Sequence, residues 1–394
     1  MRVVVAPDKF KGSASAPQVA AAISAGLRRA RPDLDVVEIP VADGGDGTVA
    51  AALAAGFAPV SALAEGPTGA PVDATFAMLA MRAGRSVGSA GSSAGGSTAG
   101  GSSAGGSTAV VELADVAGLR RLPGGDVAVA PLTASTYGVG QVIAAALDAG
   151  ATEIVLGIGG SASTDGGAGM VQALGIGLSD QRGHNLARGG AALRDLAAIR
   201  LDGLDPRIAG VRLLVASDVD NPLLGPAGAA AVFGPQKGAD GPQIDRLEAG
   251  LARLAGMLGG DPGAPGAGAA GGTGYGLATA WGAVLAPGAA ELCRLAGLDR
   301  LLAATDLVIT GEGRFDATSL TGKVCGTVLA AAAAAGTPVA LVAGQVSAPA
   351  AEGLAAVVTL AGLAGGTAAA LASPAHWLHQ AGEELARDTT KGMP

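Results

Sequence analysis

The sequence predicts an α/β protein with two domains, because strands and helices alternate near both ends of its 394 residues while the middle follows another pattern. Near the N-terminus we expect a strand at 3–6, a helix at 16–31 and a strand at 36–40. Near the C-terminus the same alternation predicts elements at 307–310, 324–335, 338–343 and 356–360. Such βαβ units give a parallel sheet. We therefore expect a discontinuous Rossmann/flavodoxin-like domain made from residues 1–60 and 290–394.

The middle of the chain predicts a second, mixed α/β domain inserted at residues 61–289. Residues 71–81 and 108–113 have the composition of partners in an antiparallel hairpin. Between them, residues 88–107 form a Gly/Ser-rich stretch with a repeated pattern and no large side chains, which predicts a disordered loop. An active site is expected in the cleft between the domains, near the carboxyl ends of the parallel strands.

Composition argues against several kinds of partner and several chemistries. Aromatic residues are 2% of the chain, net charge is −8, and Lys and Arg do not cluster, so nucleic acid and anionic membranes are not expected partners. The N-terminal apolar run is too short for a signal peptide, which predicts a cytoplasmic protein. Two distant cysteines, three scattered histidines and no nucleophile elbow argue against zinc and serine hydrolase chemistry.

The glycine-rich segment 157–169 is the strongest candidate for phosphate binding. A β-branched strand leads into a turn whose glycines let the backbone approach a ligand, and a helix beginning near Gly167 would offer free N–H groups. Asp165 adds a carboxylate that suits Mg²⁺ or a substrate hydroxyl. The other candidate ligand-binding residues of this segment are Gly157, Gly159, Gly160, Ser161 and Thr164.

The same segment leaves two other functions open. Gly157-x-Gly159-x-x-Ala162 fits a loose dinucleotide fingerprint, so a nucleotide-dependent oxidoreductase of a small hydroxy acid is one alternative. No strand ending in Asp or Glu follows about twenty residues later, which counts against it. A non-catalytic, two-lobed ligand-binding protein is the other alternative, and the missing signal peptide counts against that.

Five further clusters of carboxylates, lysines and glycines follow predicted strands, at 8–13, 43–48, 218–221, 234–238 and 311–316. Phosphoryl transfer needs metal and ammonium groups that neutralise charge, and a base near the acceptor hydroxyl. Together these clusters therefore favour a kinase. Their candidate residues are Asp8, Lys9, Lys11, Asp43, Asp46, Asp218, Asn221, Lys237, Glu312 and Asp316, with Lys323 downstream.

Seven segments in this order resemble the bacterial type I glycerate kinases over about residues 1–360. They lie at 6–13, 42–48, 136–140, 157–169, 218–223, 233–238 and 310–313. The resemblance implies ATP and Mg²⁺ as cofactors, D-glycerate as acceptor and 2-phosphoglycerate as product. It also implies two α/β domains, one of them discontinuous and Rossmann-like.

Residue by residue, the resemblance assigns Asp8, Lys9 and Lys11 to the family's lysine-bearing loop. Asp43 and Asp46 match its Asp-Gly-Gly-Glu/Asp-Gly-Thr loop, Asp165 its Thr-Asp-Gly-Gly carboxylate, and Glu312 and Asp316 its late acidic loop. Two features depart from the family pattern: the Gly/Ser-rich insertion, and Ala-Thr-Ser at 317–319 where the family has Gln-Ser.

These residues lead to a mechanistic hypothesis. The phosphates of ATP lie along 157–164, with Lys9 or Lys11 neutralising the transferred group. Asp165 is the first choice, and Asp46 the second, for orienting or deprotonating the glycerate hydroxyl. The remaining roles are Lys237 and Lys323 for the glycerate carboxylate, and Asp165 and Asp218 for Mg²⁺. A monomer or a homodimer is expected, and only the resemblance indicates which carbon is phosphorylated.

Overall fold

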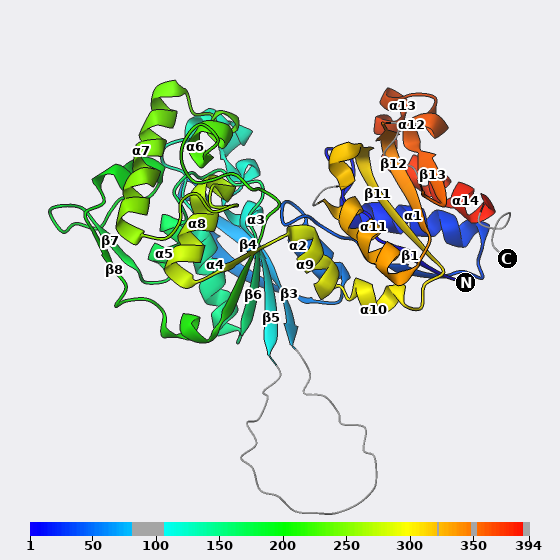
Figure 1. Cartoon of the computed structure of the whole chain (residues 1–394), viewed down its shortest axis with the longest axis horizontal. Coiled ribbons are helices and arrows are strands. Elements are labelled where there is room, and N and C mark those ends of the chain that lie inside the picture. The colour runs from blue at the N-terminus through cyan, green and yellow to red at the C-terminus, as the bar shows by residue number, and fades with distance from the viewer. Residues whose placement is uncertain (81–105, 321–322, 348–352, 389–394) are drawn as a thin grey trace, which may run out of the picture.

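The computed structural model describes residues 1–80, 106–320, 323–347 and 353–388. The disordered loop predicted at 88–107 falls, except for its last two residues, outside this described part. Two lobes lie side by side, one around each of two large sheets (Figure 1). This is the predicted α/β architecture.

The first sheet has five parallel strands in the order β13-β12-β11-β1-β2. Both ends of the chain contribute to it, as the sequence predicts. Val3, Val4 and Val5 in β1 are buried on both faces, which is typical of a central parallel strand. The strands are β1 (Arg2–Val5), β2 (Asp35–Glu38), β11 (Leu307–Phe315), β12 (Val339–Val346) and β13 (Ala356–Thr359).

Helices cover both faces of this sheet. On one face, α1 (Ala16–Ala30) packs against α14 (Pro374–Asp388), and α11 (Val324–Ala335) lies on the other. Ser15 begins α1 with a reciprocal capping box to Gln18. The remaining helices of this lobe are α10 (Leu298–Leu302), α12 (Leu360–Ala364) and α13 (Thr367–Ala372). Within the described residues, no helix is long and apolar enough to span a membrane.

The second sheet is mixed, with the order β10-β9-β6-β5-β4-β3. Strands β5 and β4 pair antiparallel, as predicted for 71–81 and 108–113, and β3 adds a further antiparallel strand. The other neighbours are parallel. The strands are β3 (Ala58–Glu65), β4 (Pro71–Ala80), β5 (Ser107–Glu112), β6 (Glu153–Gly157), β9 (Arg212–Ala216) and β10 (Val284–Ala286), with a separate pair β7 (Gly177–Ser179) and β8 (Ala198–Arg200).

A large apolar core lies between one face of the second sheet and its helices. These helices are α3 (Leu113–Ala117), α4 (Tyr137–Asp148), α5 (Ala168–Ala173), α6 (Ala229–Phe233), α7 (Gly241–Leu258) and α8 (Ala269–Trp281). Short 3₁₀ turns lie at Leu119–Arg121, Pro123–Gly125, Val127–Val129, Gly190–Asp195, Pro206–Gly210, Pro235–Lys237 and Ala317–Leu320.

The two lobes share apolar packing. Helices α2 (Thr48–Ala54) and α9 (Gly288–Leu295) lie between the sheets, in one buried cluster that contains Val4 and Val308 of the first sheet and Val155 of the second. Because α2 and α9 belong to this shared cluster, the exact division at 60/61 and 289/290 stays a proposal. The packing holds the carboxyl ends of both sheets next to each other.

Candidate active site

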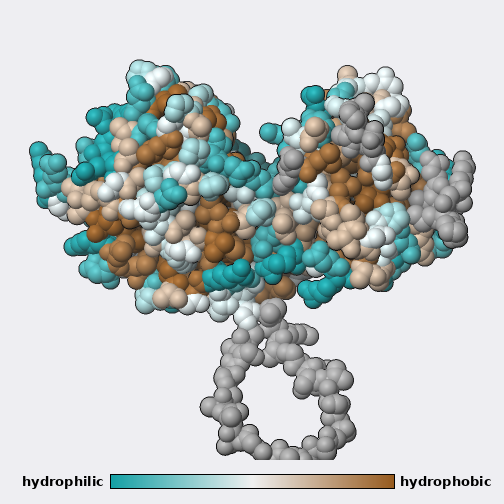
Figure 2. Space-filling model, in the orientation of Figure 1, coloured by the Kyte–Doolittle hydropathy of each residue, from teal (hydrophilic) through white to brown (hydrophobic). Residues whose placement is uncertain are grey.

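One cleft runs between the lobes at the carboxyl ends of strands from both sheets. It encloses a cavity of about 690 Å³, and a notch is visible between the lobes in Figure 2. The first sheet contributes the segments after β1 and β2 and the ends of β11 and β12, and the second contributes those after β6 and β9. The cavity therefore lies where the sequence analysis expects an active site.

Ten of the predicted site residues line this cavity, and seven do not. The ten are Asp8, Lys9, Lys11, Asp43, Asp46, Gly159, Gly160, Asp218, Glu312 and Lys323. The seven are Gly157, Ser161, Thr164, Asp165, Asn221, Lys237 and Asp316. The cavity thus unites four of the five further polar clusters with Gly159 and Gly160, and it leaves the rest of the 157–169 segment behind its wall.

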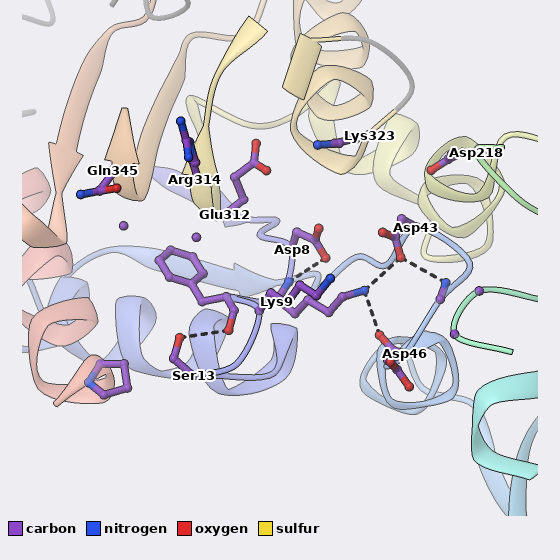
Figure 3. A pocket seen from close by; sticks show the side chains of 18 of the residues that line it. Asp8, Lys9, Ser13, Asp43, Asp46, Asp218, Glu312, Arg314, Lys323 and Gln345 are labelled. Carbon is purple, nitrogen blue, oxygen red and sulfur yellow. Dashed lines mark hydrogen bonds and ion pairs between the residues drawn. The ribbon is translucent and has the colours of Figure 1, made fainter. Parts of the chain in front are cut away.

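Lys9 is held in place by the Asp43 loop (residues 43–47). Its Nζ atom donates to Oδ1 of Asp43 at 3.0 Å and to the carbonyl oxygen of Asp46 at 3.1 Å (Figure 3). Burial lowers the pKa of Lys9, but the carboxylates of Asp43 and Asp8 outweigh it, so that the net pKa is raised above its ordinary value. Lys9 is therefore a fixed positive charge.

Two carboxyl groups of the cavity have pKa values raised by burial towards neutrality, Asp218 to about 6 and Asp8 to about 7, and of the two only Asp8 also lines the second cavity described below. The Oδ1 atom of Asp8 accepts a hydrogen bond of 2.7 Å from the backbone amide of Lys9. Burial, and then the negative charge of Asp43, raise its pKa to about 7, against the opposing effect of Lys9. A carboxyl group in this range can gain or lose a proton near neutral pH.

Two further lysines of the cavity have no carboxylate partner within 4 Å in the part of the chain that the structure describes. Lys11 is exposed and makes no hydrogen bond or ion pair there, whereas Lys323 donates to Oγ1 of Thr318 at 3.0 Å. The sequence could not separate Lys9 from Lys11. Their contacts in the structure distinguish their roles. Lys9 is paired with the carboxylate of Asp43, whereas Lys11 is available to an anionic ligand.

A second cavity of about 450 Å³ is lined by the whole Asp8 loop (residues 8–15). Asp8, Lys9, Lys11 and Asp46 line both cavities. Arg120 adds a guanidinium group to the smaller one. The two cavities therefore meet at the loop that carries the acid and the two lysines.

Two residues that the sequence analysis missed hold the Asp43 loop. Glu112 is buried at the end of β5, and its Oε2 atom accepts hydrogen bonds of 3.1 Å from the amides of Gly47 and Val49. Arg120 bridges Oε1 of Glu112 at 3.0 Å and Oδ1 of Asp46 at 2.9 Å. Neither residue lies in a local motif, so only their position in the fold reveals this role.

The glycines at the start of the 157–169 segment serve packing between loops. The amide of Gly159 donates to the carbonyl of Gly44 at 3.0 Å. A Cβ atom on Gly157 would lie 2.7 Å from that carbonyl oxygen, and one on Gly159 would lie 2.6 Å from Cα of Gly45. The absence of side chains thus lets the Asp43 loop lie directly on this segment, and only Gly159 and Gly160 reach the cavity.

Gly159→Ala should therefore displace the Asp43 loop. We expect kcat to fall about a hundredfold, since displacements of about 1 Å can have such effects on catalysis. Steady-state kinetics, together with a thermal unfolding curve, measures this. Gly241→Ala is the matched control, because a Cβ atom there meets nothing within 4 Å. Equal activity of the two variants would show that this close packing does not position the site.

Asp165 is fully buried, and its carboxylate accepts hydrogen bonds from backbone amides at the start of α5, the helix end that was predicted to bind phosphate. Its Oδ2 atom accepts hydrogen bonds from the amide and the hydroxyl of Thr136, at 2.8 and 2.9 Å, and from the amide of Gly169 at 3.3 Å. Its Oδ1 atom accepts from Gly167 at 3.3 Å. The amides of Ala168 and Met170 are also bonded within the protein. The expectation of free N–H groups at the start of α5 is therefore wrong.

Lys237 lies behind the cavity wall in the same buried region. Its Nζ atom donates to Oγ of Ser161 at 2.9 Å and to the carbonyl oxygen of Ser163. Burial lowers the pKa of Lys237 to about 7, and the negative charge of Asp165 opposes this. Burial likewise raises the pKa of Asp165, against its hydrogen bonds. In this conformation, Lys237 holds the 157–169 segment in place through hydrogen bonds and does not face the cleft.

Asn221 and Asp316 are engaged in local turns outside the cavity lining. The side-chain amide of Asn221 donates to the carbonyl of Ala227 at 2.8 Å. Oδ1 of Asp316 accepts from the amide and the hydroxyl of Thr318, at 2.9 and 2.7 Å. Their roles in ligand binding remain predictions without a contact to the cavity.

The carboxylates of the cavity suit a cation that is shared with a ligand. Among the described residues, no group of three or more His, Cys, Asp and Glu is arranged to hold a metal by itself. Mg²⁺ commonly takes one or two carboxylates and completes its shell with phosphate oxygens and water. Glu312 fits this use, because its Oε1 atom is buried and has no hydrogen-bond partner within the described part of the chain. Asp218 lines the cavity from the other lobe.

Comparison with known proteins found one matching family model and several similar proteins. The "Glycerate kinase family" model matches residues 3–390. Glycerate kinase of Bacillus subtilis (strain 168) is 40% identical over 353 residues, which cover 88% of this chain and 86% of that protein. Glycerate 2-kinase of Escherichia coli (strain K12) is 39% identical over 333 residues, covering 82% and 80%.

A solved structure supports the same relationship. The crystal structure assigned as glycerate kinase 2 from Salmonella typhimurium LT2 has a TM-score of 0.81 to this chain and 38% sequence identity. It covers 99% of this chain and 98% of its own. The similarity therefore includes both lobes and the cleft between them.

Proposed function

Because the chain belongs to the glycerate kinase family, we propose that it transfers the γ-phosphoryl group of ATP to the C2 hydroxyl of D-glycerate, giving 2-phosphoglycerate and ADP. It is a kinase, and kinases of this family use ATP. The observation that best supports the proposal is the Asp8 loop, which brings a carboxyl group of pKa about 7 and two lysines to the meeting point of two cavities.

The two cavities suggest how the substrates divide. The larger one has a volume that suits a nucleotide, and the smaller one lies beside it with Arg120 and Lys11 in its lining. We assign the nucleotide to the larger cavity and the small hydroxy acid to the smaller. Transfer then takes place at the Asp8 loop, where the two substrates face each other.

Asp8 is the residue that we assign to proton transfer. General base catalysis is most efficient when the pKa of the base lies near the working pH, and Asp8 meets this condition. Asp46 pairs with Arg120, and Asp165 is bonded behind the wall. Asp8 accepts the proton of the attacking hydroxyl, so the oxygen gains nucleophilic character as the bond to phosphorus forms.

Lys11 is the residue that we assign to the anionic groups of the substrates. The transferred phosphoryl group and the glycerate carboxylate both need positive charge, and Lys11 has no competing partner among the described residues. Lys9, already paired with Asp43, orients the loop and adds a fixed charge. Lys323 offers a second ammonium group on the nucleotide side.

Mg²⁺ is proposed at one of two separate carboxylates of the cavity, Glu312 or Asp218, which Figure 3 shows apart with Lys323 between them. Among the residues that the structure describes, Glu312 has a buried oxygen without a partner, and Oδ1 of Asp218 accepts one hydrogen bond, from the amide of Gly288 at 2.9 Å. When bound with the nucleotide, the ion would neutralise charge on the phosphate oxygens. Asp165, the other predicted ligand, already accepts four protein hydrogen bonds of 3.3 Å or less and is not retained for this role.

The alternative functions lose their main support. The dinucleotide fingerprint depends on Gly157 and Gly159, whose bare backbones are covered by the Asp43 loop. A ligand-binding protein without catalysis has no need for the ionisable group at the meeting point of the cavities. The cytoplasmic location and the monomeric or homodimeric state expected from the sequence stay predictions.

A coupled assay of ADP release tests the proposal. The purified chain, with ATP and MgCl₂, is supplied in turn with D-glycerate, L-glycerate, glycolate or D-lactate. We expect ADP release that depends on the acid and is greatest with D-glycerate. ADP release that is the same without any acid, or greater with one of the other three, would contradict the proposed acceptor.

A further inference from the structure

The larger cavity has a charged end and an apolar end. Gln345 lies at one end in Figure 3, Asp43 and Asp218 lie at the other, and Asp8 lies between them. The lining at the Gln345 end comes from β12 and from α12, α13 and the start of α14. None of the lining residues that the structure describes in this C-terminal stretch, from Gly344 to Pro374, carries a charge. The two ends therefore suit different parts of one ligand.

The floor of the apolar end is bare backbone. Gly313 in β11 and Gly344 in β12 both line the cavity, and neither has a side chain to fill it. A Cβ atom on Gly344 would lie 2.3 Å from the carbonyl oxygen of Gly313, so no larger residue fits without moving the strands. These two paired positions on adjacent strands leave a small area of bare backbone, on which a planar ring can lie.

An exposed leucine forms one side of this end. Leu371 is 59% exposed, although it lines the cavity together with the buried Leu360 and Ala370. Figure 2 shows hydrophobic residues gathered on this lobe next to the notch. Leaving a leucine in water loses the free energy that burial would give, and an apolar ligand group would recover it.

The polar side chains at this end are Gln345, Thr367 and, beside Gln345 on β11, Arg314, whose guanidinium faces Asp316 at 3.6 Å. The amide of Gln345 suits the edge of a base. The side-chain amide of Gln345 donates through Nε2 to Oγ1 of Thr367. Its carbonyl oxygen makes no hydrogen bond within the described residues, and its second N–H remains. An amide can donate and accept at once, which matches the neighbouring donor and acceptor atoms of a purine edge.

We propose that this apolar end of the cavity binds the adenine base of ATP. The base lies over Gly313 and Gly344, packs against Leu371 and turns its polar edge to Gln345. This assignment rests on the proposed function, since it takes ATP as the phosphoryl donor. With the base here, the phosphates extend towards Lys323 and Asp8, whereas a base at the opposite end would cover carboxylates and remove their water.

Photolabelling with 8-azido-ATP, followed by peptide mass spectrometry, locates the base. We expect the label on residues 360–374, with protection by unmodified ATP. Label confined to residues 8–18, 43–48 or 216–219 would overturn the assignment. Because labelling needs binding but no turnover, label on 360–374 without glycerate-dependent ADP release would support the base site and contradict the proposed acceptor.

Leu371→Ala gives a kinetic test of the same site. We expect KM for ATP to rise about tenfold, because truncating a leucine removes apolar contact worth about that factor, while KM for glycerate stays the same. Leu201→Ala is the matched control, since Leu201 is 56% exposed and lies outside the cavity lining. If Leu371→Ala and Leu201→Ala gave the same KM for ATP, the assignment would be wrong.

Discussion

Asp8→Asn is expected to lower kcat for glycerate phosphorylation by about a thousandfold, with little change in stability. Loss of a general base commonly costs between a hundredfold and ten thousandfold in rate. The side chain is half-buried and its one hydrogen bond, from the amide of Lys9, can also be accepted by the amide oxygen of asparagine. Steady-state kinetics with saturating ATP, and a thermal unfolding curve on the same preparation, measure both effects.

The pH dependence of the unmodified protein gives a second readout of Asp8. Its pKa of about 7 means that the carboxylate, which is the form that accepts a proton, decreases tenfold for each pH unit below 7. We therefore expect kcat/KM for glycerate to rise with pH up to about 7 and then to level off. The γ-phosphate of ATP also changes its ionisation in this pH range, and it does so equally in assays of the wild type and of Asp8→Asn. The difference between the two pH profiles therefore gives the contribution of Asp8 alone.

Asp202→Asn is the control for this substitution. Asp202 is exposed, on the turn that follows β8, and its side chain comes no nearer than 4.0 Å to Arg200. We expect its kinetics and its pH profile to match those of the wild type. An Asp8→Asn variant with near-normal kcat and an unchanged acid limb would remove Asp8 from the mechanism.

Asp165→Asn is expected to reduce stability more than any other single substitution considered. Its carboxylate is buried and accepts hydrogen bonds from Thr136, Gly167 and Gly169. Asparagine replaces one acceptor oxygen by an NH₂ group, which faces N–H and O–H donors and leaves buried groups unpaired. We expect the free energy of unfolding to fall by about 3 kcal/mol. Urea unfolding, followed by circular dichroism, measures it.

Asp240→Asn provides the contrast for Asp165. Asp240 is exposed at the start of α7 and accepts the amide of Gln243 at 2.9 Å, and asparagine is an equally good residue at such a position. Its unfolding midpoint should equal that of the wild type. If Asp165→Asn also unfolded like the wild type while kcat fell by orders of magnitude, Asp165 would be a catalytic residue after all, as the sequence alone suggests.

The sequence predicts the fold and the edge of the sheets at which the site lies. Runs such as Val3–Val5 reveal buried parallel strands, and a polar cluster after such a strand must lie at the carboxyl edge of the sheet. Five of the six clusters reach the cavity on this argument, although the 157–169 segment does so only through Gly159 and Gly160. That part of the prediction needs only local pattern and general topology.

The roles of individual residues could not be read in the same way. The glycines and hydroxyls at 157–169 have the composition of a phosphate loop, but Asp165 folds back onto its own helix start and the Asp43 loop covers the glycines. Both effects depend on contacts between segments that are far apart in the sequence. A local motif cannot distinguish an N–H group that is free from one that the protein itself satisfies.

Other contributions to the site carry no sequence signal at all. Glu112 and Arg120 fix the Asp43 loop through ion pairs across the fold, and neither belongs to a recognisable motif. Gln345 and Leu371 come together at the apolar end only because α13 packs beside β12. Such groups become visible once the tertiary structure brings them to one cavity.

Phosphorus NMR of the product tests the central claim most directly, that this chain phosphorylates glycerate at C2. The purified protein is incubated with D-glycerate, ATP and MgCl₂, and the phosphomonoester is observed without proton decoupling. A phosphate on C2 couples to the single proton of that carbon and gives a doublet, which is the predicted result. A triplet, from a phosphate on the CH₂ group of C3, or no new phosphomonoester at all, would contradict it.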